Sequence, residues 1–272
     1  MIVPVGIRAI ADAVVSVFFP APCEMCGDVL ASASPLPICE NCLATLGPLS
    51  GPICERCGRP FPSQAILDAR RPQCFACRRG LYAFDAARSY GAYSDEMVKA
   101  ITLLKYHRLT RLGGWFAKKL RTTAEATSIL RATDVLVPVP LHRERRRERG
   151  YNQTELIAKP LARLMGIPLD TGVLVRTKPR PPQLFLSRRE RWLSVRGAYE
   201  IREASRIDKR RILLIDDVFT TGATLDACAR ALKKAGAKSV VGLTVARALW
   251  RGSLPAERLR QISSDRKGRS SI

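Results

Sequence analysis

From about residue 81 onward, short apolar runs alternate with segments whose apolar residues recur at helical spacing. The apolar runs are bounded by turn residues, as is typical of strands; they cover 84–93, 134–140, 211–217 and 239–249. Between them, helical spacing predicts helices over 94–106, 113–126, 154–166 and 224–236. Because strands alternate with helices, the sequence predicts an α/β fold built on a mainly parallel sheet.

The residues at the helix ends and on the helix faces support this assignment. Ser94 stands where an N-terminal cap is expected, and Gly236 stands where a glycine that ends a helix is expected. Leu225, Cys228 and Leu232 share one face of the last helix. Cys228 is therefore predicted to be a small core residue.

Four segments lie outside this regular pattern. The sequence predicts a charged loop over 141–153 and, over the Arg- and Pro-rich stretch 168–210, a flap outside the sheet. Residues 1–20 predict an amphipathic helix, because Ile7, Ile10, Val14 and Phe18 recur at helical spacing. The apolar run contains Asp12 and is too short to cross a bilayer, which argues against a signal peptide or a membrane span. No transmembrane segment is expected, and the polar, basic end from 251 is predicted to be disordered.

Eight of the nine cysteines form four C-x-x-C pairs, a spacing that presents two thiolates to one metal ion. Interleaved pairing of the four, or one empty site, stays open. Disulfides need an oxidising compartment, for which no export signal is expected, and redox C-x-x-C motifs do not occur four to a segment. We therefore expect a cytoplasmic protein. Taken in chain order, the pairs predict two structural Zn²⁺ sites: Cys23, Cys26, Cys39 and Cys42, then Cys54, Cys57, Cys74 and Cys77.

Two adjacent carboxylates follow the apolar run of residues 212–215. Asp216 and Asp217 come where this run stops, and in an open α/β sheet ligands bind beyond the carboxyl ends of the strands. A pair of carboxylates suits vicinal sugar hydroxyls or a hard cation such as Mg²⁺. The pair therefore predicts a binding site at this edge of the sheet.

The segment after the aspartates has the residues of a phosphate cradle. Thr220, Thr221 and Thr224 supply hydroxyls just before and within the start of a predicted helix, whose first N–H groups attract anions. Gly222 allows close approach of a ligand, and no G-K-[ST] ends the loop, which excludes a Walker loop. With the two carboxylates, this loop predicts a site for a ribose 5-phosphate.

The charge balance is strongly basic. Lys and Arg number 46 against 24 Asp and Glu, a formal net charge of +22. Such an excess is typical of proteins that bind phosphates, nucleic acid or anionic surfaces. An equally good explanation is that arginines are scattered over the surface without a common partner.

The order of these motifs resembles a known family. Asp-Asp followed by T-T-G-A-T resembles the phosphoribosyl pyrophosphate signature of type I phosphoribosyltransferases. Four C-x-x-C knuckles, then LLKY, VPVPLHRERRRERGYNQTELIA, PPQLFLSRRERW and IDDVFTTGAT, resemble the ComF family, associated with competence and DNA uptake. The resemblance covers residues 1 to about 249. It implies a double zinc ribbon over 21–80 and a phosphoribosyltransferase-like domain over 81–250, between the helix over 1–20 and the tail over 251–272.

The resemblance also implies roles for individual residues. Asp216 and Asp217 would hold the ribose 2- and 3-hydroxyls, and Thr220 to Thr224 the 5-phosphate. Arg143 and Arg149 become candidate ligands of the pyrophosphate, although a solvated charge is an equal alternative for each. The candidate catalytic residues are Asp216, Asp217 and Arg149, and the candidate cofactor-binding residues are Arg143, Thr220, Thr221, Gly222, Ala223 and Thr224.

Other positions are linked to the site by the same resemblance. Asn152 and Gln153 are expected to position the arginine-rich loop, and Lys105 is a weaker candidate ligand. Gln183 and Arg191 match the flap motif of the family. The chain departs from that motif in having Ser194 where Asn is usual and Tyr199 where Phe is common.

The chemistry implied is displacement of pyrophosphate from the anomeric carbon by an unknown nitrogen acceptor, with Mg²⁺ bound to phosphoribosyl pyrophosphate. The alternative is a non-catalytic module. It would sense phosphoribosyl pyrophosphate, or bind single-stranded DNA beside competence helicase and recombination proteins. Phe61, Phe75 and Tyr82 near the knuckles are candidates for base stacking and equally for the core. The sequence sets no oligomeric state.

Overall fold

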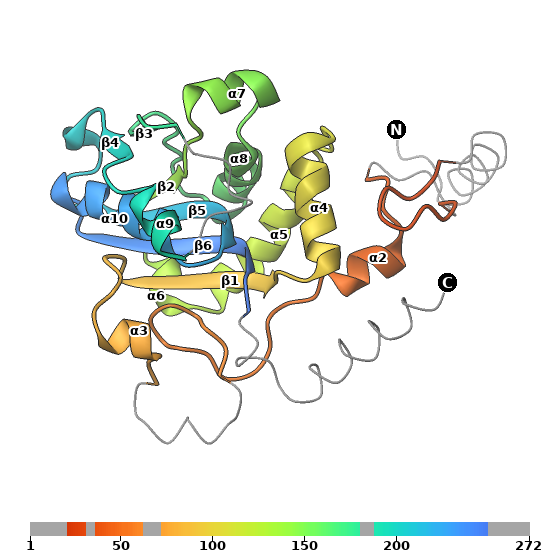
Figure 1. The fold of residues 1–272 in the computed structure, drawn as a ribbon, viewed down its shortest axis with the longest axis horizontal. Coiled ribbons are helices and arrows are strands. Elements are labelled where there is room, and N and C mark those ends of the chain that lie inside the picture. The colour runs from red at the N-terminus through yellow and green to blue at the C-terminus, as the bar shows by residue number, and fades with distance from the viewer. Residues whose placement is uncertain (1–20, 31–35, 62–71, 180–187, 250–272) are drawn as a thin grey trace.

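The computed structural model describes residues 21–30, 36–61, 72–179 and 188–249. The predicted N-terminal helix and basic end lie outside these residues. Within the described ranges, the main sheet has four parallel strands in the order β1-β6-β5-β2 (Figure 1). The predicted mainly parallel α/β architecture is confirmed. The strands are β1 (Ala86–Ala92), β2 (Val135–Pro138), β5 (Arg211–Phe219) and β6 (Ser239–Arg247).

Helices cover both faces of this sheet. On one face lie α4 (Asp95–Tyr106), α5 (Leu112–Glu125) and α8 (Gln153–Met165), and on the other lies α10 (Ala223–Lys234). The side chains of β5 alternate between the two cores. Leu213 belongs to the core on the α5 side, and Leu214 to the core on the α10 side. This strand is apolar at consecutive positions because both of its faces are covered.

The segment 168–210, predicted as a flap outside the sheet, begins with a bridge of Leu169 to Leu136 in β2, and its described strands lie outside the main sheet. It contains a small antiparallel sheet of its own, formed by β3 (Leu174–Arg176) and β4 (Tyr199–Ile201). The remaining short elements are α2 (Glu40–Thr45), α3 (Phe75–Arg78), α6 (Ser128–Arg131), α7 (Arg143–Arg149), α9 (Arg188–Leu193) and the 3-10 helix η3 (Ala204–Arg206).

Two differences from the predicted elements lie near the ends of the central strands. The charged stretch 141–153 is not a loop throughout, because 143–149 forms α7, a helix of Arg and Glu that ends at Gly150 with φ of 81°. Both residue types favour helices, and the left-handed glycine supplies the end signal. Strand β5 also continues two residues past the predicted end at 217, to Phe219, because β6 pairs with it as far as Arg247.

The predicted helix ends are confirmed. The Ser94 side chain accepts a hydrogen bond from the N–H of Met97, and Gly236, with φ of 97°, follows the end of α10. Cys228 lies fully buried on the inner face of α10, as predicted for a core residue. Within the described ranges, no helix is both long enough and apolar enough to cross a bilayer.

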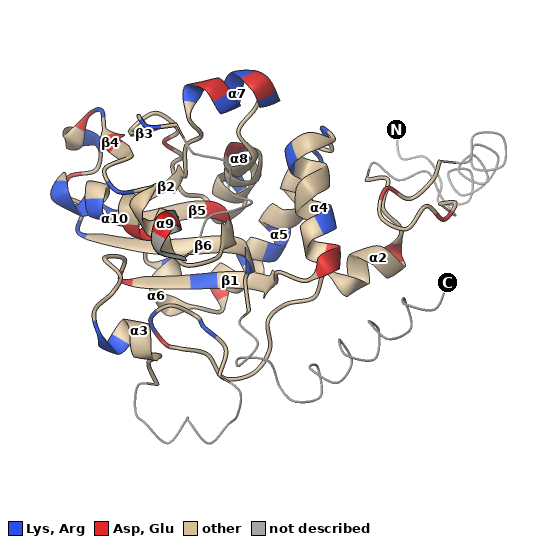
Figure 2. Ribbon diagram, viewed as in Figure 1, with Lys and Arg blue, Asp and Glu red and all other residues tan. Residues whose placement is uncertain are grey.

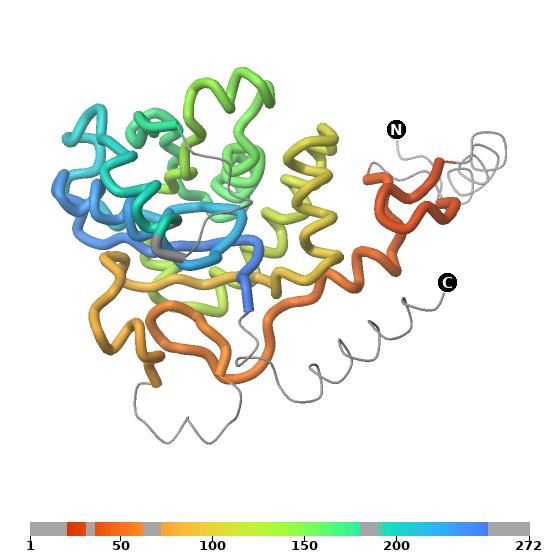
Figure 3. Tube along the Cα trace, in the orientation of Figure 1, coloured from red at the N-terminus to blue at the C-terminus, as the bar shows by residue number. Residues whose placement is uncertain are grey.

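The cysteine-rich segment forms two separate groups that contact different parts of the main domain. Figure 3 follows the chain from the first group, beside α4, to the second, next to β1. The first group packs into the core on the α5 side, and the second packs into the core on the α10 side. The two groups therefore extend the two hydrophobic cores that the sheet separates.

Candidate functional site

The structure brings the eight N-terminal cysteines together in the two sets expected from chain order. In each set, the four cysteine sulfurs all lie within 4.8 Å of one another. The sulfurs of Cys26 and Cys39 are 3.7 Å apart, and those of Cys57 and Cys74 are 3.6 Å apart. A tetrahedral zinc ion with Zn–S bonds of about 2.3 Å places its ligands about 3.8 Å apart. The spacing in both sets therefore fits zinc.

The two sets repeat one backbone design. Cys23 and Cys54 each begin a tight turn that passes through a left-handed glycine, Gly27 with φ of 86° and Gly58 with φ of 72°. Backbone N–H groups also point at the sulfurs. The N–H of Cys39 donates to the Cys23 sulfur, and that of Cys74 to the Cys54 sulfur, both at 3.3 Å. Such bonds stabilise thiolates, the form that binds a metal.

The four buried thiols of the second set need a cation among them in order to ionise. Hydrogen bonding with the Cys54 sulfur, the other thiols and burial together raise the pKa of Cys77 well above its ordinary value. Hydrogen bonding with Cys57 lowers the pKa of the Cys54 thiol. Four buried thiols in contact cannot all ionise without a positive ion among them, and zinc takes four thiolates in this geometry.

The second set is joined directly to the sheet. The N–H of Ala87 in β1 donates to the carbonyl of Arg56, which lies between Cys54 and Cys57 in the knuckle, at 2.8 Å. A Cβ on Gly58 would lie 2.7 Å from the Ala87 oxygen, so glycine is required for this close approach. This ribbon therefore packs on β1 as part of the folded domain.

A pocket lies at the carboxyl ends of the central strands. Asp216 and Asp217 are the sixth and seventh of the nine residues of β5, which continues past them to Phe219, and both are buried. Thr220 and Thr224 line the same pocket. The structure therefore gathers the carboxylates and two of the three threonine hydroxyls in one place.

Asp217 is held by residues from two other elements. Lys105 at the end of α4 forms an ion pair with it, with Nζ 2.6 Å from Oδ2. The Gln153 side chain, at the start of α8, donates to the same oxygen at 2.9 Å and accepts a hydrogen bond from Arg149. Asn152 caps α8 and donates to the Val139 carbonyl, which fixes this helix against the end of β2. Lys105, Gln153 and Arg149 thus form one network on the carboxylate.

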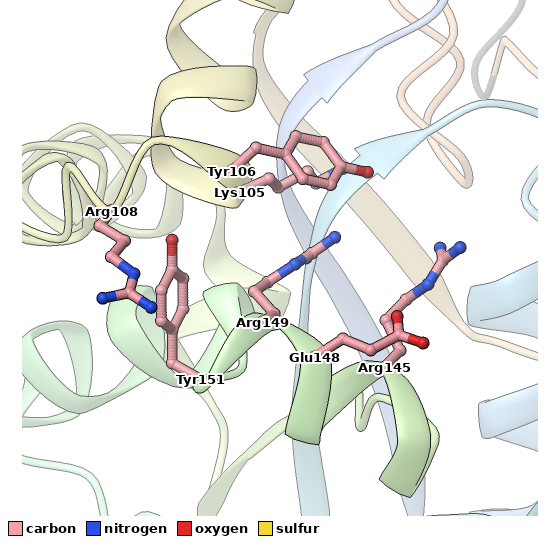
Figure 4. A pocket seen from close by; sticks show the side chains of 7 residues that line it. All are labelled: Lys105, Tyr106, Arg108, Arg145, Glu148, Arg149 and Tyr151. Carbon is pink, nitrogen blue, oxygen red and sulfur yellow. The ribbon is translucent and has the colours of Figure 1, made fainter.

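The cationic side of the pocket comes from α7. Arg145 and Arg149, one helical turn apart, both line the pocket with the aspartates, whereas Arg143 is exposed and lies outside it. Figure 4 shows Arg145 and Arg149 facing Lys105 and Tyr106 across a second hollow that adjoins the first. The Arg149 guanidinium lies 4.7 Å from the ring centroid of Tyr106, a residue that is 63% exposed.

The basic excess is not confined to this pocket. Figure 2 shows Lys and Arg on α3, α4, α7 and α10, at well separated places in the view, with Asp and Glu also on α7. Local attraction for an anion at the pocket therefore comes from the basic residues that line it, Lys105, Arg145, Arg149 and Arg176, rather than from the net charge.

The loop between β5 and α10 is built around Gly222. This residue is the N-terminal cap of α10 with φ of 82°, and Ala223, Thr224 and Leu225 form the first turn. The Thr221 hydroxyl accepts from the N–H of Ala223 at 3.4 Å, so the buried Thr221 shapes the loop, while Thr220 and Thr224 face the pocket. The first N–H groups of a helix lack helical acceptors and attract anions.

Replacing Gly222 with alanine is expected to damage both the loop and the fold. The new Cβ would lie 2.7 Å from the rings of Phe219 and Tyr82, at a φ that L residues avoid. We expect the free energy of unfolding, measured with urea, to fall by about 2–4 kcal/mol. Gly114→Ala in α5 is the matched control, because its Cβ would meet nothing within 4 Å; we expect it to stabilise by up to about 1 kcal/mol. Equal effects of the two substitutions would contradict this account of the loop.

The structure adds residues that the sequence did not single out. Arg176, the last residue of β3, lines the pocket, and its Nη1 donates to the Tyr199 hydroxyl at 3.0 Å. Its Nη2 is buried and has no hydrogen-bond acceptor among the described residues. Arg176 reaches the site through contacts between segments that are distant in the chain, which the sequence pattern does not show. The one signal in the sequence was Tyr199, whose hydroxyl accepts this hydrogen bond and which stands where the family commonly has Phe.

Other expected residues are placed as follows. Gln183 lies outside the described residues, and Arg191 lies in α9, where its side chain is not described. Tyr82 is buried and belongs to the core, whereas Phe75 is 64% exposed. Phe61 is partly buried against the core on the α10 side.

Models of two protein families match two separate parts of the chain. The model of the double zinc ribbon domain matches residues 14–78, and that of the phosphoribosyl transferase domain matches residues 154–257. The two cysteine sets and the parallel sheet with its β5–α10 loop agree with these matches. The protein therefore has a double zinc ribbon followed by a domain of the type I phosphoribosyltransferase fold.

Curated relatives narrow this class to one family. Competence protein F of Haemophilus influenzae is 28% identical over 215 residues, which cover 78% of this chain and 90% of that protein. Competence protein ComFC of Bacillus subtilis is 32% identical over 212 residues, which cover 77% of this chain and 84% of that protein. The chain belongs to the ComF family.

A solved structure similar to the chain is glutamine phosphoribosylpyrophosphate amidotransferase from B. subtilis. It is 19% identical, with a TM-score of 0.38, and the match covers 60% of this chain and 37% of that one. Because this TM-score is low, the fold is assigned from the family models and from the parallel sheet and not from that solved structure.

Proposed function

We propose that this protein binds phosphoribosyl pyrophosphate with Mg²⁺ and transfers the phosphoribosyl group to a nitrogen acceptor, releasing pyrophosphate. One observation carries the proposal. Two buried carboxylates, Asp216 and Asp217, share a pocket with the Thr220 to Thr224 loop and with cations from α4 and α7. Each part of the proposed substrate has a chemical counterpart there.

In this proposal Asp216 and Asp217 accept hydrogen bonds from the two ribose hydroxyls. Lys105 now pairs with Asp217, so the ribose would share that carboxylate with the lysine. The 5-phosphate would lie against the start of α10, with the hydroxyls of Thr220 and Thr224. Arg145 and Arg149 would contact the pyrophosphate, in place of the Arg143 and Arg149 pair expected from sequence.

The step we propose breaks the bond between the anomeric carbon and the pyrophosphate oxygen and forms a bond from that carbon to the acceptor nitrogen. The pyrophosphate leaves with the electron pair, and the acceptor gives up a proton to solvent. Positive charge develops on the ribose, beside the aspartates, and negative charge develops on the leaving group, beside the arginines. When bound, Mg²⁺ would neutralise part of the pyrophosphate charge.

Thermal unfolding in the presence of fragments of the substrate tests the proposal. Phosphoribosyl pyrophosphate with Mg²⁺, at about 100 times its dissociation constant, should stabilise the fold by about 2.7 kcal/mol and raise Tm by about 5–10 °C. At the same concentration, ribose 5-phosphate and pyrophosphate should each give a smaller shift, because each fills part of the pocket. Glucose 6-phosphate is the control anion, and an equal shift with it would contradict the site.

Turnover is tested separately by measuring pyrophosphate release while nitrogen bases are screened as acceptors. Release that depends on an acceptor supports transfer. Binding without release for every acceptor would favour the sensing alternative, in which the same pocket holds phosphoribosyl pyrophosphate as a signal.

A second candidate function, binding of single-stranded DNA, is favoured by the hollow in Figure 4. Exposed Tyr106 stands among Arg108, Arg145 and Arg149, and an aromatic platform among cations suits a single strand. We expect Tyr106→Ala to weaken binding of an oligothymidine about tenfold, a loss of stacking, at fixed salt. Lys119→Ala, which removes a cation on α5 beside Trp115, is the control. Unchanged binding by Tyr106→Ala, together with a loss in Lys119→Ala, would indicate non-specific attraction by charge and no stacking on Tyr106.

We also propose a cytoplasmic location, where structural Cys₄ zinc sites persist. All nine cysteines lie in the described residues and none forms a disulfide, which suits a reducing compartment.

A further inference from the structure

Arg247 lies between the second zinc set and the β5–α10 loop. It is the last residue of β6 and is 4% exposed. Its Nη1 donates to the carbonyl oxygen of Cys57 at 2.7 Å, and its Nη2 donates to the Cys57 sulfur at 3.5 Å. A zinc ion with four thiolates carries a net negative charge, so the metal site supplies the counter-charge that a buried guanidinium needs.

The same guanidinium also supports the loop. Its Cζ lies 3.9 Å from the ring centroid of Phe219, and the two residues are paired across β5 and β6. Phe219 immediately precedes Thr220, and its ring occupies the space beside Gly222, where an added Cβ would meet it at 2.7 Å. The Arg247 side chain therefore contacts both the expected zinc ligand Cys57 and Phe219, the residue that leads into the loop.

Tyr82, shortly after Cys77 in the chain, makes a second connection. Its hydroxyl donates to the carbonyl of Thr221 at 3.1 Å. Its ring stacks on Phe84, with centroids 4.7 Å apart, and meets Phe219 edge-on at 6.1 Å. Tyr82, which follows the second ribbon, and Arg247 thus both contact Phe219, and Tyr82 also bonds to the loop at Thr221.

We propose that Arg247 is a positioning residue through which zinc in the second set fixes the β5–α10 loop, so that metal occupancy of this set governs affinity for the sugar phosphate. The ligand in this inference rests on the proposed function, whereas the coupling rests on the contacts of Arg247. The first set is attached elsewhere: Lys99 of α4 donates to the Met25 carbonyl, and Tyr90 donates to that of Leu46. Metal loss from the first set is therefore expected to leave the loop unchanged.

Hydrogen exchange in the full zinc-loaded chain tests the coupling without any ligand. Arg247→Met removes the charge and the donors, and we expect exchange across 219–226 to become about tenfold faster. Arg88→Met is the matched control. Arg88 is partly buried beside the same ribbon and donates to the Ala87 carbonyl at 2.8 Å, and we expect its loss to leave exchange in the loop unchanged. Zinc content is measured for every variant.

Affinity for phosphoribosyl pyrophosphate is the second measurement. We expect Arg247→Met to weaken binding about tenfold, and Arg247→Lys, which keeps the cation without the planar fork, to weaken it less. A double-mutant cycle with Phe219→Leu distinguishes positioning from general destabilisation. If Arg247 acts through Phe219, the two losses of affinity are not additive, whereas a purely structural role gives additive losses that follow Tm.

The outcomes separate this inference from the proposed function. Unchanged loop exchange in Arg247→Met with its zinc retained overturns the coupling, whether or not the chain binds the ligand. If Arg247→Met loses zinc, Arg247→Lys takes its place in the same comparison. Faster loop exchange in the variant, together with no binding of phosphoribosyl pyrophosphate by the wild type, supports the coupling and refutes the proposed function.

Discussion

Replacing both Asp216 and Asp217 with asparagine is expected to weaken binding of phosphoribosyl pyrophosphate at least about 100-fold. Each hydrogen bond to a charged acceptor contributes about 1.5–3 kcal/mol, and every 1.4 kcal/mol is a factor of ten in affinity. Both carboxylates are buried at the carboxyl end of β5, so water does not replace the lost bonds well. Equilibrium dialysis with labelled ligand and Mg²⁺ measures the change.

A matched substitution at the opposite end of the sheet is the control. Asp134, just before β2, forms an ion pair with Arg211, the first residue of β5. The distance from Asp134 Oδ1 to the guanidinium Nη2 is 2.6 Å. Asp134→Asn makes the same chemical change far from the pocket, so affinity should stay within about twofold. Comparable losses in both variants would show that the aspartates act on the fold rather than on the ligand.

Removing the metal from the second cysteine set is expected to have the largest effect on stability. Its four sulfurs are buried and belong to the core on the α10 side, next to Tyr82 and Phe84. Structural zinc contributes about 10–16 kcal/mol in small zinc domains, and a whole domain has about 5–15 kcal/mol of net stability. We therefore expect Cys57→Ser to lower the free energy of unfolding by about 5 kcal/mol or more, as followed by circular dichroism with zinc analysis.

Two further cysteine variants separate metal loss from loss of a buried sulfur. Cys228→Ser makes the same change at a fully buried thiol outside both sets, and should cost about 1–3 kcal/mol with zinc retained. Cys26→Ser affects the first set, where Cys26 is exposed, and should cost less than Cys57→Ser. A Cys57→Ser protein that lacks zinc but keeps wild-type stability would show that this set has no structural role.

The parts of this molecule predicted correctly from sequence are those set by local signals. The first C-x-x-C pair of each set is a tight turn followed by its own left-handed glycine, Gly27 or Gly58, and the grouping expected from chain order is the one that the structure shows. The strand over 239–249 and the helix over 224–236 follow from hydrophobic period and end residues, such as Gly236. The family resemblance supplied the link between these parts.

The parts that the sequence did not predict depend on partners distant in the chain. The sequence pattern placed the end of β5 at residue 217, but pairing with β6 extends it to Phe219. Helix α7 has no apolar face for a periodic pattern to detect, and its formation places Arg145 beside Arg149 while Arg143 points elsewhere. The contacts of Arg176 and Arg247 join segments whose proximity no local pattern indicates.

The most direct measurement of the central claim is a calorimetric titration of the zinc-loaded wild-type chain with phosphoribosyl pyrophosphate, with and without Mg²⁺. We expect one site per chain, with an affinity near micromolar in Mg²⁺, about −8 kcal/mol, and weaker binding without it. Absence of binding by a folded chain that holds two zinc ions would contradict the proposed function. The pocket around Asp216 and Asp217 would then be a remnant of the fold rather than a working site.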